Sequence, residues 1–243
     1  MKAFILAAGL GTRLGTLTSN KPKALVEVNG KSMLENLVIH LKSQGIQQFL
    51  INVHHFAEQV IQHVKDKNNF GVDIVFSDES QELLDTGGAI TKAADFFKGD
   101  EIILVYNVDV ASGINLEELA NYHKQKNALT TLCVRKRHSS RALLFDEKMQ
   151  LAGWANLVQD DYKWVNQPKS TFESFAYSGV YLAHPDFARK LPFTGHFSII
   201  DAWLKMAETE RIIGFEDLSD YWFDLGTKEK IQKAEEYFST NSK

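Results

Sequence analysis

Residues 2–14 read KAFILAAGLGTRL, a run of apolar side chains that passes directly into a loop of small residues. An apolar run that ends at glycine is typical of a β-strand buried on both faces of a parallel sheet. The loop contains Gly9 and Gly11, which let backbone N–H groups approach an anion closely, and Arg13, whose guanidinium suits phosphate oxygens. Because ligands of open α/β sheets bind beyond the carboxyl ends of the strands, this loop is the first candidate site.

Strand and helix patterns alternate through the first half of the chain. The patterns predict strands at 2–7, 49–53, 72–76, 102–106 and 129–134, and helices at 32–44, 56–65, 88–97 and 116–126. Shorter extended pieces at 142–145, 151–154 and 175–182 indicate an inserted sheet or lid, and a helix at 198–208, a strand at 211–215 and a helix at 227–238 follow. We therefore expect an α/β fold, Rossmann-like, with a mixed, mostly parallel sheet flanked by helices and a small inserted β-sheet. A length of 243 residues fits a single domain.

The composition excludes several classes of protein. With 44% hydrophobic and 24% charged residues, the chain is unlike disordered, collagen-like or membrane proteins. Its net charge is −4 and its basic residues are scattered, which argues against nucleic acid as a partner. Cys133 is the only cysteine, so no disulfide or thiolate metal site can be built from it, and we expect a cytoplasmic protein. The first apolar run is too short to span a bilayer, and we expect neither a targeting segment nor a membrane partner.

Three further segments carry residues suited to phosphate chemistry. Asn107 and Asp109 directly follow a predicted strand, where side chains project from the carboxyl edge of a sheet. The segment YWFDLGT (residues 221–227) combines a strand with a helix cap and leaves the Asp224 carboxylate free. The segment DTGGAI (residues 85–90) joins a glycine pair to a helix start, so we expect its backbone donors to be free for a flat base or a phosphate.

A dinucleotide site is the first alternative for the glycine loop. The dinucleotide fingerprint is Gly-x-Gly-x-x-Gly running directly into a helix. Here Leu14 stands at the place of the third glycine, and the first well-marked helix begins only near residue 32. The sequence therefore disfavours a dinucleotide-dependent oxidoreductase.

The glycine loop also resembles a known signature. Residues 6–14 (LAAGLGTRL), followed by residues 21–26 (KPKALV), resemble the signature of the sugar-1-phosphate nucleotidyltransferases, also called nucleotide-sugar pyrophosphorylases. Within that family the short chain is most similar to N-acetylmuramate 1-phosphate uridylyltransferases and to single-domain mannose- or heptose-1-phosphate guanylyltransferases. The resemblance implies the nucleotide-diphospho-sugar transferase fold, with a nucleotide-binding core at about 1–135 and a sugar-binding insertion with closing elements at about 136–243. It also implies an enzyme that joins a nucleoside triphosphate to a sugar 1-phosphate and releases pyrophosphate.

The same resemblance implies roles for individual residues. Arg13 and Lys23 would be catalytic, contacting the reacting phosphates, and Asp109 and Asp224 would bind Mg²⁺, with Mn²⁺ as an alternative ion. The nucleotide would contact Ala8, Gly9, Gly11, Thr12, Arg13, Lys23, Gly87 and Gly88. The sugar 1-phosphate would contact Asn107, Glu173 and Gly179.

Some positions depart from the family pattern. Thr16 stands where the family often has proline, and Val108 replaces the glycine of the family's Asn-Gly-Asp segment. Residues 153–157 lack the Glu-Lys-Pro that many relatives use to hold the sugar phosphate. The identities of the sugar and the base therefore stay open, as does the choice between a monomer and a small homo-oligomer. A catalytically silent nucleotide-sugar sensor is the second alternative, which the presence of both aspartates disfavours.

Overall fold

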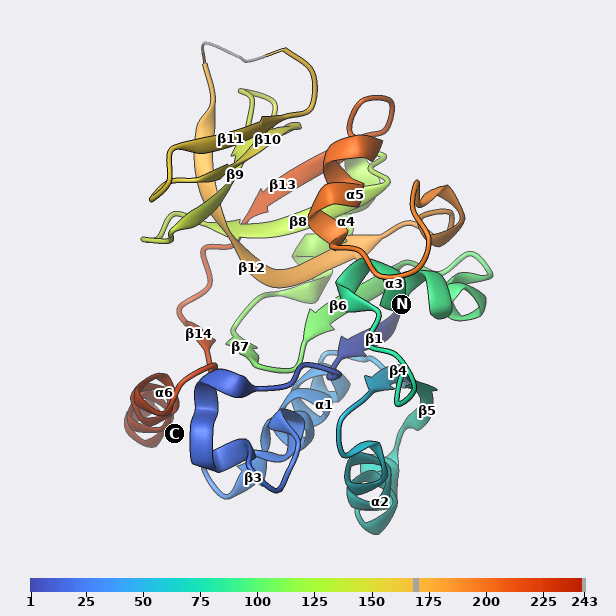
Figure 1. Cartoon of the computed structure of the whole chain (residues 1–243), viewed down its shortest axis with the longest axis vertical. Coiled ribbons are helices and arrows are strands. Elements are labelled where there is room, and N and C mark those ends of the chain that lie inside the picture. The colour runs from blue at the N-terminus through green and yellow to red at the C-terminus, as the bar shows by residue number, and fades with distance from the viewer. Residues whose placement is uncertain (168–170, 242–243) are drawn as a thin grey trace. The chain divides into compact units, whose positions relative to one another are not determined.

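The structure is a computed structural model that describes residues 1–167 and 171–241. The chain forms two compact units. The N-terminal unit comprises Lys2–Leu83, Tyr106–Gly113 and Asp220–Lys243, and the central unit comprises Met1, Leu84–Val105 and Ile114–Ser219. Figure 1 shows the elements of both units, and each is described by itself below.

The N-terminal unit contains a parallel sheet in the order β1, β4, β5 (Figure 1). These strands are β1 (Lys2–Leu6), β4 (Gln48–Val53) and β5 (Asp73–Asp78), and the helices of the unit are α1 (Met33–Ser43), α2 (Ala57–Asp66) and α6 (Lys228–Asn241). Two antiparallel pairs complete it, β2 (Glu27–Val28) with β3 (Lys31–Ser32), and β7 (Val110–Ser112) with β14 (Trp222–Asp224). The β7–β14 pair joins segments that are far apart in the sequence.

Helix α1 illustrates how the sequence determines an element of this unit. The Ser32 side chain accepts a hydrogen bond from the Glu35 N–H, which caps the first turn. The buried face carries Met33, Leu34, Leu37, Val38 and Leu41. The predicted helix at 32–44 is confirmed, since only its two terminal residues lie outside the observed helix.

The central unit is built around the long strand β12 (Glu173–Ala183), which pairs antiparallel with β8 (Thr130–Arg135) and β9 (Arg141–Phe145). Strand β10 (Leu151–Asn156) lies between β9 and β11 (Asp161–Trp164), and β13 (Ile212–Glu216) runs parallel to β8. The helices are α3 (Asp85–Lys92), α4 (Leu116–Gln125) and α5 (Ile199–Met206). Strand β6 (Ile103–Asn107) leads from the central unit into the N-terminal unit.

The α/β class and the small inserted β-sheet predicted from the sequence are confirmed, with two local corrections. The glycine loop expected after the first strand contains the 3-10 segment Thr12–Thr18, bent at Gly15, whose φ is 57°. The expected helix at 88–97 begins earlier, at Asp85, and ends at Lys92, after which a separate 3-10 turn follows. The single-domain organisation of residues 1–243 stays a prediction. Among the described residues, every helix is too short or too polar to cross a bilayer.

Acid should weaken the central unit through one histidine. His123 of α4 is buried, its Nδ1 lies 2.8 Å from Thr131 Oγ1, and burial lowers its pKa to about 4. Above pH 6.5 the imidazole is neutral in both the folded and the unfolded chain, and the folded state has its full stability. As pH falls from about 6.5 towards 4, the unfolded chain binds a proton that the buried imidazole does not, so the free energy of unfolding decreases.

We therefore expect the free energy of unfolding to depend less on pH in His123→Gln than in the wild type. Because glutamine gains no charge, the wild type should lose about 3 kcal/mol more than the variant between pH 7 and 4. Urea denaturation across that pH range measures the difference. Parallel pH profiles would contradict the assignment of a neutral buried imidazole.

Candidate active site

The start of the glycine loop is anchored to the buried side chain of Asn52. The N–H groups of Ala7 and Ala8 both donate to Asn52 Oδ1, at 2.6 and 3.3 Å. The amide of Asn52 in turn donates to Oε1 of the buried Glu79, at 2.8 Å. Strand β4 therefore determines where the loop leaves β1, because two of its backbone donors are bound to one fixed oxygen.

Gly9 and Gly11 have different structural reasons for being glycine. Gly11 has φ 67°, and a Cβ there would lie 3.0 Å from Lys23 Cβ and 3.0 Å from Thr18 Cγ2. A Cβ at Gly9 would meet no described atom within 4 Å, so packing does not exclude a side chain there. Thr12 begins the 3-10 segment, and the Thr18 hydroxyl donates to the carbonyl of Gly11 at 3.0 Å. The loop thus has a defined conformation of its own.

Lys23 and Asp109 form an ion pair in which both side chains are largely buried. Lys23 follows Pro22 and lies in a short 3-10 segment, while Asp109 follows β6. The neighbouring Val108 donates its N–H to the carbonyl of Leu6 at 3.1 Å, which ties the Asp109 turn to the end of β1. Two of the predicted site residues are therefore in direct contact.

Asp224 lies at the end of β14, and its neighbour contacts the backbone of Asp109. In the β7–β14 pair, Asp224 lies opposite Val110, and the N–H of Leu225 donates to the carbonyl of Asp109 at 2.7 Å. The backbones of the two predicted metal ligands are therefore held beside one another by strand pairing, although the residues are far apart in the sequence.

The Asp224 carboxylate is surrounded by donors. Its Oδ1 accepts the N–H of Gly226 at 2.9 Å, and its Oδ2 accepts a hydrogen bond from Lys230 Nζ. Burial alone would raise the pKa of Asp224, but the Lys230 hydrogen bond and charge, the Gly226 N–H and the Arg13 charge together hold the pKa below its ordinary value. Asp224 is therefore a carboxylate at neutral pH.

Arg13 reaches the same place from the glycine loop. A Cβ on Gly226 would lie 3.0 Å from Arg13 Nη2 and 2.7 Å from Asp224 Oδ1. The guanidinium and the carboxylate thus occupy the space beside Gly226, which explains the glycine in that turn. The structure brings together four predicted residues of the N-terminal unit: Arg13, Lys23, Asp109 and Asp224.

The donor set at this place suits Mg²⁺. Within residues 1–167 and 171–241, no group of three or more His, Cys, Asp or Glu side chains is arranged to hold a metal ion. Magnesium is usually held by one or two carboxylates, with waters and substrate phosphates as its other ligands. Asp109 and Asp224 supply two carboxylates, and the residues present therefore fit this ion.

Gly87 and Gly88 belong to the central unit, where the structure gives them a packing role. The Gly87 N–H donates to the carbonyl of Phe197 at 2.9 Å, so the expectation that it is a free donor is wrong. A Cβ on Gly88 would lie 2.2 Å from the carbonyl oxygen of Gly195. The pair is glycine because the segment at 195–197 packs directly on this turn of α3, and its contact with nucleotide stays a prediction.

The predicted sugar contacts are divided between the two units. Asn107 ends β6 in the N-terminal unit and is half-buried. Glu173 and Gly179 lie on β12 in the central unit, where Glu173 Oε2 is 2.8 Å from Lys136 Nζ and Gly179 has φ 79°. Their contact with a sugar stays a prediction.

Sequence reasoning missed Asn52, Glu79 and Lys230. A signal existed for Asn52, which is a polar residue inside the apolar strand QFLINV. Burial of an amide in such a strand indicates fixed hydrogen-bond partners. Lys230 is one of several basic residues in the last helix, and its spacing gives no indication of its partner.

Asn52→Leu should lower stability and disorganise the loop. The substitution removes the acceptor of the Ala7 and Ala8 N–H groups and one donor to Glu79, so we expect a loss of about 2–4 kcal/mol in the free energy of unfolding. Urea denaturation measures it, with the exposed Gln48→Leu on the same strand as the control. A loss no larger than that of the control would show that the network does not hold the loop.

Comparison with known proteins gives the family. A family model described as nucleotidyl transferase matches residues 2–241. The N-acetylmuramate α-1-phosphate uridylyltransferase of Caulobacter vibrioides is 28% identical over 239 residues, which cover 96% of this chain and 95% of that protein. The mannose-1-phosphate guanyltransferase of Yarrowia lipolytica is 29% identical over 229 residues, which cover 93% of this chain but 61% of that protein.

A solved structure shows the same fold. HddC from Yersinia pseudotuberculosis, in complex with GMP-PN, superposes with a TM-score of 0.79 at 24% identity, over 98% of this chain and 99% of that chain. This likeness confirms the predicted nucleotide-diphospho-sugar transferase fold. Since the family model covers the chain from its first strand to its last helix, the chain belongs to the nucleotidyl transferase family.

Proposed function

We propose that the chain transfers a nucleoside monophosphate from a nucleoside triphosphate to a sugar 1-phosphate and releases pyrophosphate. The proposal rests on one observation: two basic side chains and two carboxylates lie together beside a glycine loop. They belong to Arg13, Lys23, Asp109 and Asp224. The relatives reported above are a uridylyltransferase and a guanyltransferase, and their names refer to sugar 1-phosphates. This supports UTP or GTP as the nucleotide donor.

The chemical difficulty of this reaction is charge. A sugar 1-phosphate has a second pKa near 6, so it is largely ionised at neutral pH and needs no general base. It must approach a triphosphate that carries several negative charges, and each pair of like unit charges at ~4 Å costs about 4 kcal/mol at an effective dielectric of about 20. Catalysis therefore depends on positioning and on neutralisation of charge.

Residues of the N-terminal unit would position the substrates and neutralise their charge. Backbone N–H groups of the glycine loop and the Arg13 guanidinium bind and orient the phosphates of the nucleotide. Lys23 supplies an ammonium group beside Asp109, which offsets charge on the reacting phosphates. Asp109 and Asp224 would hold Mg²⁺, or Mn²⁺ in its place, and the ion when bound neutralises charge on phosphate oxygens. The displacement at the α-phosphorus is in line and has no covalent intermediate.

The two alternatives make different predictions. A catalytically silent nucleotide-sugar sensor would bind both substrates without releasing pyrophosphate. A dinucleotide-dependent oxidoreductase would bind NAD(H), which Leu14 at the third glycine position disfavours. A matrix of five nucleoside triphosphates against a panel of sugar 1-phosphates, measured by pyrophosphate release, separates the transferase from both alternatives and identifies the base and the sugar. A binding titration with NAD(H) then separates the two alternatives from one another.

Asp109→Asn and Asp224→Asn should each abolish turnover while the fold is retained. The substitutions keep side-chain size but remove the negative charge that a divalent cation needs. Pyrophosphate release measures turnover and thermal unfolding measures the fold, with the exposed Asp66→Asn as the control. A near-normal kcat in either variant would contradict the assignment of that aspartate.

Lys23→Ala should reduce kcat/KM by roughly two to four powers of ten, or ~3–5 kcal/mol of transition-state stabilisation. The expected loss is large because the ammonium acts in a largely buried site. Lys21→Ala is the matched control, since Lys21 lies two residues earlier in the same segment. A change smaller than about fivefold in Lys23→Ala would remove Lys23 from the mechanism.

A further inference from the structure

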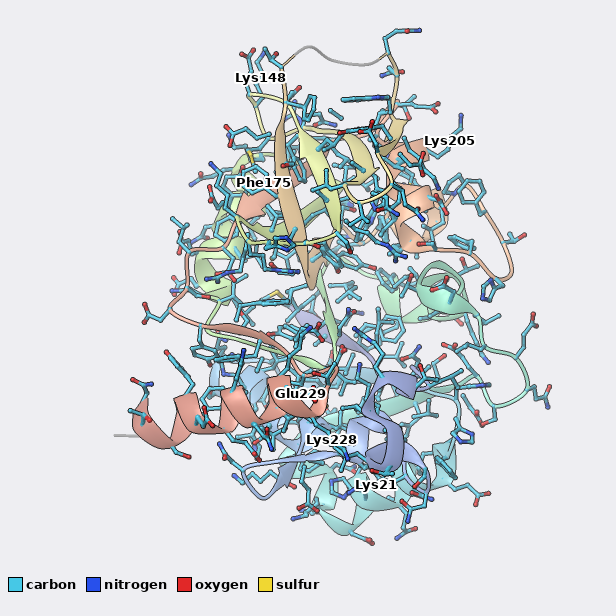
Figure 2. All side chains as sticks on the ribbon, turned by 60° about the vertical axis from the view of Figure 1, so that its left-hand side comes forward. Lys21, Lys148, Phe175, Lys205, Lys228 and Glu229 are labelled. Carbon is cyan, nitrogen blue, oxygen red and sulfur yellow. The ribbon has the colours of Figure 1, made fainter. Side chains whose placement is uncertain are left out.

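The first turn of α6 brings two lysines to the candidate site. Lys230 Nζ donates a hydrogen bond to Asp224 Oδ2, and Lys228 Nζ donates to Thr16 Oγ1 at 3.0 Å. Figure 2 labels Lys228 at the start of the α6 ribbon, together with Glu229. All these residues belong to the N-terminal unit. The proposed function gives a role to neither lysine.

Stability of the helix does not explain lysines at this position. The N-terminal turn of a helix carries a partial positive charge, so cations there are disfavoured by about 0.3–1 kcal/mol each. Lys230 is also 46% exposed, whereas Asp224 is only 22% exposed. A surface ion pair contributes about 0–1 kcal/mol to the free energy of unfolding, so stability alone does not account for the contact between Lys230 and Asp224.

Each of the two carboxylates is matched by one lysine. Asp109 pairs with Lys23, and Asp224 pairs with Lys230. An ammonium and a divalent cation repel one another and compete for the same carboxylate oxygens. A divalent cation bound by both aspartates would therefore displace both ammonium groups.

The displaced ammonium groups could then bind phosphate oxygens of the substrates. Three positive charges, those of Arg13, Lys23 and Lys230, act directly on the two negative charges of the aspartates. A divalent cation raises this local charge from +1 to +3, which favours a polyphosphate. The four-carbon stem of a lysine lets its ammonium move from one anion to another nearby.

We infer that Lys230 is a partner-exchanging residue: it neutralises Asp224 in the metal-free protein and moves to a phosphate oxygen when a divalent cation binds Asp224. The inference rests on the proposed function, because it takes Asp224 as a metal ligand. It predicts two opposite effects of removing the ammonium. Affinity for the metal alone should increase, and affinity for a polyphosphate in the presence of the metal should decrease.

The test uses Lys230→Met, which keeps the length of the side chain but removes its charge. Titration with Mn²⁺ alone, followed by the electron paramagnetic resonance of the free ion, should give a dissociation constant lowered roughly three- to tenfold. Titration with pyrophosphate at saturating Mn²⁺, followed by calorimetry, should give a dissociation constant raised roughly three- to tenfold. Lys230→Arg, which keeps the charge, should stay close to the wild type in both titrations.

Lys233→Met is the matched control, because Lys233 is exposed and lies one turn further along the same helix. It should change neither constant, and thermal unfolding should show all variants folded. Lys230→Gln gives a second neutral side chain in case methionine disturbs the helix.

Two results would overturn the inference. Unchanged constants in both Lys230→Met and Lys230→Gln would make the contact an ordinary surface ion pair. Weaker Mn²⁺ binding in these variants would mean that Lys230 supports Asp224 structurally. Asp224→Asn tests the proposed function separately: if it binds Mn²⁺ as well as the wild type does, the metal assignment itself fails. If Asp224→Asn loses Mn²⁺ but Lys230→Met matches the wild type, only the inference fails.

Discussion

A backbone hydrogen bond from the Leu225 N–H to the Asp109 carbonyl, 2.7 Å long, holds together the two segments on which the candidate site depends. It extends the β7–β14 pair by one step and brings the end of β14 beside the turn that follows β6. The carboxylates of Asp109 and Asp224 then belong to adjoining stretches of backbone. Strand pairing therefore fixes the backbones of the two predicted metal ligands side by side.

The carboxylates of Asp109 and Asp224 are surrounded by positive charge. Each aspartate is paired with a lysine, and Arg13 adds to the positive charge near Asp224. This pairing reduces the repulsion between two carboxylates that lie on neighbouring segments. The same cations suit the phosphates of the substrates. A set of groups that is stable without ligands is therefore also complementary to a polyanion.

Much of the fold and part of the site could be predicted from local sequence. The Ser32–Glu35 cap and the helical spacing of the apolar residues predicted both ends of α1 to within one residue. The apolar run before Asn107 predicted that Asp109 follows the end of a strand. Lys230 and Glu79 could not be predicted, because their partners are determined by tertiary packing of distant segments. The prediction of a free N–H at Gly87 was wrong for the same reason, because the carbonyl of Phe197 that accepts this N–H comes from a distant segment of the chain.

The shared-ion site is tested most directly by a crystal structure of the protein grown or soaked with Mn²⁺ and pyrophosphate, with the ion located by its anomalous scattering. We expect one anomalous peak within coordination distance of a carboxylate oxygen from both Asp109 and Asp224, with the ammonium groups of Lys23 and Lys230 directed at phosphate oxygens. A peak on only one aspartate, or at another place in the molecule, would contradict the shared-ion site on which the proposed function depends.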